Sequence, residues 1–155
     1  MTYVAEARPR RRITPAKPSL GRLELRLSQS RVTRARIDSH VRSLLGRRNE
    51  AIATALADKV PLAAVAEVVG IRAADVKRLA GAYQELHYSG AQHQWHLAGL
   101  TATVRQLAAA LEEKDECIRR LRDDVMEGLE SGRLDVFRAA ALTALPTDRI
   151  RELTR

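Results

Sequence analysis

Apolar residues recur at helical spacing through most of the chain. Leu, Ile and Val return every three or four residues from Ser30 or Thr33 to about Lys59, and arginines occupy the other faces. Pro61 then interrupts the pattern and suits the first turn of a following helix. Residues 20–27 fit either a helix or an alternating strand. The pattern predicts an all-α protein that begins with a long helix.

Two short helices separated by a glycine are predicted over residues 62–81. Ala66 stands where two crossing helices leave room for only a methyl group. Gly70 stands where the backbone needs positive φ, which costs alanine about 1 kcal/mol. The positions expected to pack between these helices are Val65, Val69, Ile71, Val76 and Leu79. A third helix is therefore expected from about Ala73 to Tyr83.

With Ala66, Gly70 and Val76 in the diagnostic places, this segment resembles the helix-turn-helix DNA-binding proteins of bacteria and their phages. In such proteins the second short helix lies in the major groove. The resemblance implies a trihelical DNA-binding unit over residues 20–90, the alternative being an ordinary corner of two helices. It also implies which residues face DNA: Arg72, Ala73, Ala74, Lys77 and Arg78.

The end of the chain, residues 136–155, looks like a divergent second copy of this pattern. At one constant offset, Ala140, Leu145, Ile150 and Leu153 correspond to Ala66, Ile71, Val76 and Leu79. The copy departs from the pattern at Ala144, which replaces the turn glycine, and at Pro146. We expect a degenerate helix-turn-helix-like unit over residues 131–155, which either contacts DNA or forms a helical cap or protein-binding corner. The candidate DNA contacts in this unit are Thr147, Arg151 and Arg155.

A heptad pattern over residues 91–130 predicts the longest helix, with a coiled-coil-like apolar stripe. Its apolar positions are Leu97, Leu100, Val104, Leu107, Leu111, Ile118, Leu121 and Val125, and Lys114 interrupts them. The stripe can pack either on residues 33–59 of the same chain or on a second chain. Because bacterial helix-turn-helix proteins are commonly dimeric, we expect it to mediate homo-oligomerisation, with a dimer favoured.

Positive charge is concentrated at the N-terminus. Residues 1–48 hold thirteen Lys or Arg and three acids, whereas the other 107 residues hold fourteen basic and sixteen acidic side chains. Residues 1–19 contain three prolines and little apolar surface, so we expect a disordered basic arm. Arg8, Arg10, Arg11 and Arg12 would lie along phosphates or enter a minor groove. A solvated tail that aids solubility is the alternative.

Catalytic and metal chemistry find little support in the sequence. His87, His93 and His96 lie near Trp95, but no Cys or carboxylate nearby completes a ligand set. We expect no enzyme activity, cofactor, metal or small-molecule substrate. A single cysteine and the absence of a long apolar segment argue against disulfides and membrane insertion. A cytoplasmic, nucleoid-associated location is expected.

Together these patterns predict a sequence-preferring protein that binds double-stranded DNA, acting as a transcriptional regulator in a bacterium, plasmid or phage. One alternative is a DNA-packaging or segregation adaptor, because a helix-turn-helix with an oligomerising helix also resembles small terminase subunits. Another is a helical protein-interaction module whose basic arm binds an acidic partner.

Overall fold

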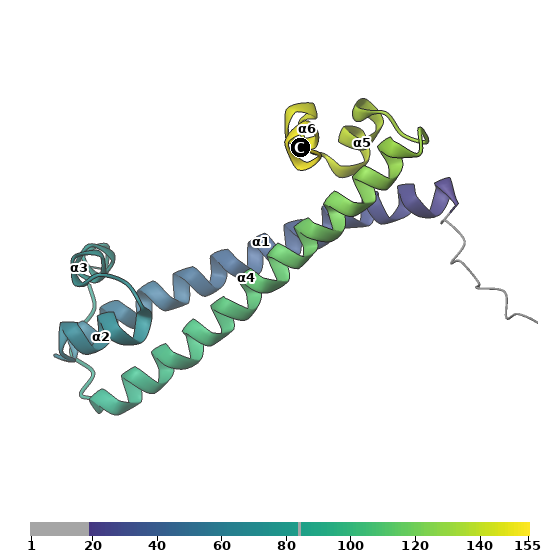
Figure 1. The fold of residues 1–155 in the computed structure, drawn as a ribbon. Helices are drawn as coiled ribbons and strands as arrows, with labels where there is room; N and C mark the ends of the chain where they lie inside the picture. The colour runs from purple at the N-terminus through teal and green to yellow at the C-terminus, as the bar shows by residue number, and fades with distance from the viewer. Residues whose placement is uncertain (1–18, 84) are drawn as a thin grey trace, which may run out of the picture.

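The computed structural model describes residues 19–83 and 85–155, and this part of the chain forms six helices with no strand (Figure 1). The helices are α1 (Leu20–Ala57), α2 (Leu62–Val69), α3 (Ala73–Ala80), α4 (His93–Glu130), α5 (Val136–Thr143) and α6 (Thr147–Leu153). The all-α prediction is confirmed. Within the described residues, no helix has the length and apolar character needed to cross a bilayer.

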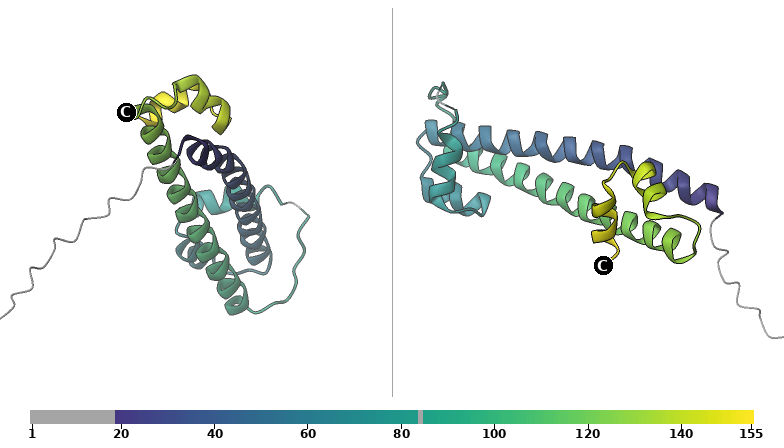
Figure 2. Two further views of the ribbon diagram at one scale, coloured as in Figure 1. Left: turned by 90° about the vertical axis from the view of Figure 1, so that its right-hand side faces the viewer. Right: turned by 90° about the horizontal axis from the view of Figure 1, so that it is seen from above.

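Two long helices form a rod. α1 and α4 contain 38 residues each and lie antiparallel, as Figure 2 shows from two directions. At about 1.5 Å per residue, each helix is roughly 57 Å long. The pair α2 and α3 packs at one end of the rod, and the pair α5 and α6 packs at the other (Figure 1).

The core runs along the rod and continues beneath both pairs of short helices. Its middle contains Ile37, Val41 and Leu44 of α1 with Leu107 and Ala110 of α4. The cluster under α2 and α3 includes Ile52, Val65, Val76 and Leu100, and the cluster under α5 and α6 includes Leu27, Val125, Ala139 and Ile150. Full burial of each large aliphatic side chain contributes about 1.5–3 kcal/mol. The long helices therefore hold the short ones in place.

The apolar stripe of α4 packs on α1 of the same chain, whereas the sequence prediction placed it between chains. Leu100, Leu107, Leu121 and Val125 are buried there, Leu97, Val104 and Ile118 are half-buried, and Leu111 is 44% exposed. The physical reason is that α1 is as long as α4 and supplies a matching apolar face. Homo-oligomerisation itself stays a prediction.

α1 begins at Leu20, ahead of the start that the sequence predicted, because residues 20–27 are helical. Leu23 and Leu27 are fully buried, and Arg26 forms ion pairs with Asp124 (2.7 Å) and Glu127 (3.1 Å) of α4. These contacts decide between the helix and strand alternatives. They are made across the rod, so no local pattern could reveal them.

The described part of the chain contains the same series of one long and two short helices twice. Adding 73 to the bounds of α1 gives the bounds of α4, and adding 74 to those of α2 gives those of α5. α6 likewise begins 74 residues after α3 and is one residue shorter. The repeat that the sequence indicated at the C-terminus therefore extends back to the first helix.

A buried polar cluster ties the loop before α4 to the end of α1. The carboxylate of Asp58 accepts hydrogen bonds from the Ser89 amide (2.5 Å) and the Ser89 hydroxyl, and its Oδ2 lies 2.6 Å from Nε2 of His96. Nε2 of His93 lies 3.2 Å from the Asp58 carbonyl oxygen. The pKa of Asp58 lies below its ordinary value, mainly because the carboxylate accepts the hydrogen bond from the Ser89 hydroxyl.

We predict that Asp58→Asn lowers the melting temperature by several degrees at pH 7, because an amide has one acceptor oxygen where the carboxylate has two. A lowered pKa in the folded state gives stability that is present above the unfolded pKa of about 4 and is lost as pH falls below it. The difference in melting temperature between the wild type and this variant should therefore shrink on acidification. Circular dichroism melts between pH 7 and 2.5 measure it, with Asp115→Asn on exposed α4 surface as control. A difference that stayed constant with pH would contradict the role of the ionised carboxylate.

The two copies fill the junction between their long and short helices with different volumes. In the first copy Ala55 and Val60 are buried there, and in the second the corresponding residues are Gly128 and Leu134. A Cβ on Gly128 would lie 2.6 Å from Cδ1 of Leu134 and 3.3 Å from its Cβ. Leu134, which is larger than Val60, therefore fits only because position 128 is a glycine.

Gly128→Ala should lower the free energy of unfolding by about 1–3 kcal/mol, the usual cost of overpacking a core. Adding Leu134→Val recreates the pair of the first copy and should recover most of this loss. Urea unfolding of both variants measures the two values, and Leu134→Val alone completes the double-mutant cycle. Additive losses would show that the two positions do not compensate each other.

Candidate nucleic-acid interface

The turn between α2 and α3 has the conformation that the sequence predicted. Gly70 has φ 73° and ψ 28°, in the left-handed region, and its amide donates to the carbonyl oxygen of Ala66 at 2.9 Å. A Cβ built at Gly70 would meet no atom within 4 Å. Glycine is therefore needed here for its backbone conformation and not for space.

The third helix packs by its apolar side and ends earlier than predicted. Val76 is fully buried beside Val65 and Val69 of α2. α3 ends at Ala80, and the chain continues to Tyr83 only as a turn, closed by a bond from the Tyr83 amide to the Ala80 carbonyl oxygen (3.0 Å). The helix that presents the candidate DNA contacts thus has eight residues.

The five residues predicted to face DNA lie together on the exposed part of this helix and at its start. The side chains of Arg72 and Arg78 are 85% and 77% exposed, and Ala73, Ala74 and Lys77 are also exposed. The two alanines have short side chains that leave the backbone open to a close approach, and the three cations share the same exposed part of the helix. This arrangement suits a polyanion whose base edges must be reached.

Asp75 orients the two arginines, which the sequence did not reveal. Its carboxylate accepts from Nε of Arg72 at 2.9 Å and from Nη2 of Arg78 at 3.0 Å. The hydrogen bond from Arg72 lowers the pKa of Asp75, so the carboxylate stays ionised. It offsets one of the three positive charges while it holds both guanidinium groups beside the start of α3.

The second unit keeps the left-handed turn without a glycine. Ala144 has φ 52° and ψ 37°, and Ile150 of α6 is fully buried, like Val76 of α3. Arg34 of α1 donates to the carbonyl oxygen of Thr143, so the end of α5 is held from the rod. Tertiary packing thus holds Ala144 in the left-handed conformation that Gly70 adopts in the first copy.

The outward side of α6 carries a mixed set of charges. Of the three residues predicted there, Arg151 and Arg155 are exposed and Thr147 is half-buried. Arg151 pairs with Asp148 at 2.8 Å, and Arg149 pairs with Glu152 at 2.7 Å. α6 packs mainly on α5 and reaches the core of the rod through Ile150, and a cavity of about 100 Å³ lies between α6, α1 and α4.

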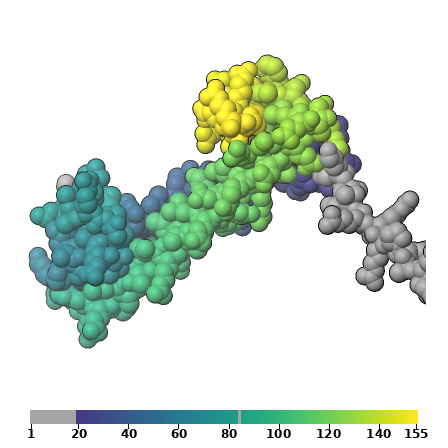
Figure 3. Space-filling view, in the orientation of Figure 1, coloured from purple at the N-terminus to yellow at the C-terminus, as the bar shows by residue number. Residues whose placement is uncertain are grey.

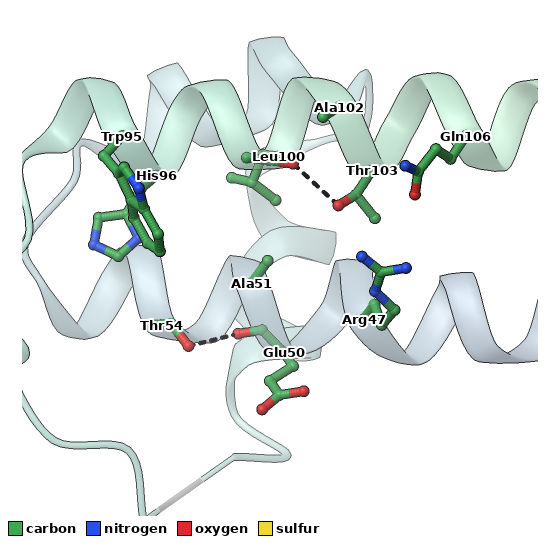
Figure 4. A pocket seen from close by; sticks show the side chains of 11 residues that line it. Arg47, Glu50, Ala51, Thr54, Trp95, His96, Leu100, Ala102, Thr103 and Gln106 are labelled. Atoms are coloured by element: carbon green, nitrogen blue, oxygen red, sulfur yellow. Dashed lines mark hydrogen bonds between the residues drawn. The ribbon is translucent and has the colours of Figure 1, made fainter.

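A larger groove of about 440 Å³ lies between α1 and α4 near the α2 end of the rod (Figure 4). Trp95 and His96 lie at one end of it, and Arg47 and Gln106 lie at the other. The hydroxyls of Thr54 and Thr103, which also line it, donate to carbonyl oxygens of their own helices. Few polar groups therefore converge on the groove.

The predicted arm residues and the predicted histidines belong to neither α3 nor α6. The arm with Arg8, Arg10, Arg11 and Arg12 lies outside the described residues. His93 and His96 belong to the Asp58 cluster, which the sequence did not reveal because Asp58 is 38 residues from His96. Among the described residues, no group of three or more His, Cys, Asp or Glu side chains is arranged to hold a metal ion.

Comparisons of the chain with protein-family models, with curated proteins and with solved structures give no significant match.

The two left-handed turns lead to opposite predictions for exchanging glycine and alanine. Gly70→Ala should lower the free energy of unfolding by about 1 kcal/mol, because alanine is strained at this φ. Ala144→Gly should raise it by up to about 1 kcal/mol, since relief of strain is partly offset by the freedom of glycine in the unfolded chain. Gly46→Ala, inside α1, is the control and should stabilise the protein by about 1 kcal/mol. Chemical denaturation measures all three, and a stabilising Gly70→Ala would exclude a required left-handed turn.

Proposed function

We propose that the protein binds double-stranded DNA with a sequence preference and acts as a transcriptional regulator in a bacterium, plasmid or phage. In this proposal α3 enters the major groove. Arg72 and Arg78 are the candidates for two-point hydrogen bonds to guanine, and the methyl groups of Ala73 and Ala74 are candidates for contact with thymine.

One observation carries the proposal: α3 is buried along one side and cationic along the other. Val76 anchors the helix, and the exposed side has Lys77 flanked by Arg72 and Arg78, which Asp75 orients. An ordinary corner of two helices needs the buried side only. The exposed cations around short side chains are what a reader of DNA requires in addition.

In this proposal the basic arm provides most of the affinity for DNA and α3 provides the specificity, because the two regions differ in charge. Residues 49–90 carry four basic and five acidic side chains, so the region around α3 has little overall attraction for DNA. The arginines at positions 8 to 12 supply sequence-independent attraction to phosphates, which steers the protein to DNA. α3 then contributes the preference for particular base pairs.

The test measures duplex affinity as a function of salt for the wild type and for Lys77→Ala/Arg78→Ala. We expect the double variant to bind at least about tenfold more weakly. The slope of log affinity against log salt should also fall by up to about two, since each lost phosphate contact removes roughly one. Fluorescence anisotropy with a duplex enriched by in vitro selection gives both quantities.

The matched control is Arg47→Ala/Arg120→Ala, which removes the same charge from exposed positions on α1 and α4. This variant should retain wild-type affinity for the selected duplex. An equal loss in the control would indicate diffuse electrostatic attraction without a role for α3. Failure of the selection to enrich any sequence would overturn the regulator proposal.

A further inference from the structure

We infer that one chain is a two-headed DNA reader, in which α3 and α6 contact two inverted, unequal half-sites about one helical turn apart. This inference rests on the proposed function of α3. It adds that the second short pair is a DNA-contacting unit, and that a single chain has the two-fold character that such proteins usually gain by dimerisation.

Equivalent positions of the two copies are buried in the core. Leu27 and Ile52 of α1 correspond, at an offset of 73, to Leu100 and Val125 of α4, and all four are fully buried. At an offset of 74, Val60 corresponds to Leu134 and Val76 to Ile150, and these are buried too. Each short pair therefore places the same positions in the core at its end of the rod, although α3 also packs along α1 whereas α6 makes no comparable contact with α4.

The surface of the rod repeats as well. The groove of about 440 Å³ near the α2 end has a counterpart of about 420 Å³ toward the α5 end. Arg47, Ala51 and Gln106 line the first, and their equivalents Arg120, Asp124 and Thr33 line the second. Two equivalent helices that lie antiparallel are related by a two-fold axis across the rod, and the paired grooves follow that symmetry.

Both short pairs project from the same side of the rod. Figure 1 shows α3 and α6 above α1 and α4, and Figure 3 shows a saddle between the two lobes that contain them. A two-fold axis that runs through this saddle directs both units toward one ligand. On a duplex, two units that are related by a two-fold axis contact half-sites that are inverted relative to each other.

The length of the rod between the two units matches the repeat of DNA. Leu27 and Ile52, which lie in the cores under the two pairs, are 25 residues apart on α1, and Leu100 and Val125 are 25 apart on α4. At about 1.5 Å per residue, this separation is roughly 37 Å. Successive major grooves on one side of B-DNA recur every 34–36 Å or so.

The second unit has a small net positive charge, although the two arginines of α6 pair with acids of the same helix, Arg149 with Glu152 and Arg151 with Asp148. Residues 133–155 hold five arginines and three acids, against three basic and two acidic side chains in residues 61–83. Arg151 takes the position of Lys77, whereas Glu152 takes that of Arg78 and Arg149 that of Asp75. The two units therefore favour different base pairs, and the expected target is an imperfect inverted repeat.

The experiment uses the full chain and a duplex enriched by in vitro selection. We expect two unequal inverted half-sites with centres about 10 base pairs apart, and one chain per duplex by native mass spectrometry. Inserting five base pairs between the half-sites turns one of them to the opposite side of the helix. Affinity should then fall about a hundredfold, as expected when one of two linked contacts is lost.

Arg149→Ala/Arg151→Ala provides the matching protein variant. Its affinity for the original duplex should fall by a similar factor, and the insertion should no longer change it. The control Arg47→Ala/Arg120→Ala should keep the full effect of the insertion. If the α6 variant does not fold, the wild-type stoichiometry and spacing dependence still decide the question.

Two chains on each duplex, a single enriched half-site, or insensitivity to the insertion would overturn the inference and leave the proposed function standing. Failure of the proposed function looks different. The wild type would then bind no duplex, or Lys77→Ala/Arg78→Ala would bind as tightly as the wild type.

Discussion

The packing of α1 against α4 is the interaction on which the rest of the structure depends. Each long helix has one apolar side and would expose it to water if it stood alone. In the rod, Leu44 and Leu107 are buried in the middle, and Leu27 and Leu100 are buried toward the two ends. Leu27 and Leu100 also form part of the floor on which the short helices dock. The placement of α3 and α6 is therefore a consequence of the register of two helices.

Polar contacts fix that register, because apolar packing alone tolerates sliding along a helix. Lys114 interrupts the apolar stripe of α4, and its ammonium group lies 2.7 Å from the carboxylate of Asp38 on α1. This hydrogen bond lowers the pKa of Asp38. Asp58 performs a similar task at one end of the rod, where it holds the loop before α4 through Ser89 and the first turn of α4 through His96. Both contacts join α1 to chain that follows much later in the sequence.

Comparison of the two copies separates positions that serve packing from positions open to change. Buried positions remain apolar in both copies, and a larger side chain at one position is matched by a smaller residue beside it. The pair Ala55 and Val60 in the first copy, and the pair Gly128 and Leu134 in the second, show this exchange. Exposed positions on the third helix of each copy change freely in charge, as between Arg78 and Glu152. Such a difference has little effect on folding, since surface substitutions rarely change stability by more than about 0.5 kcal/mol.

The sequence by itself determined the helical class, the left-handed glycine between α2 and α3, and the cationic positions on α3, because spacing and turn chemistry are local properties. It also indicated the C-terminal repeat. Only the tertiary structure decided that Leu97 to Val125 packs within the chain, that residues 20–27 are helical, and that Asp58 meets His96. These outcomes depend on which of several apolar faces and buried donors meet across the rod. Local periodicity shows that a face exists, but the partner of that face is set by the packing of the whole chain.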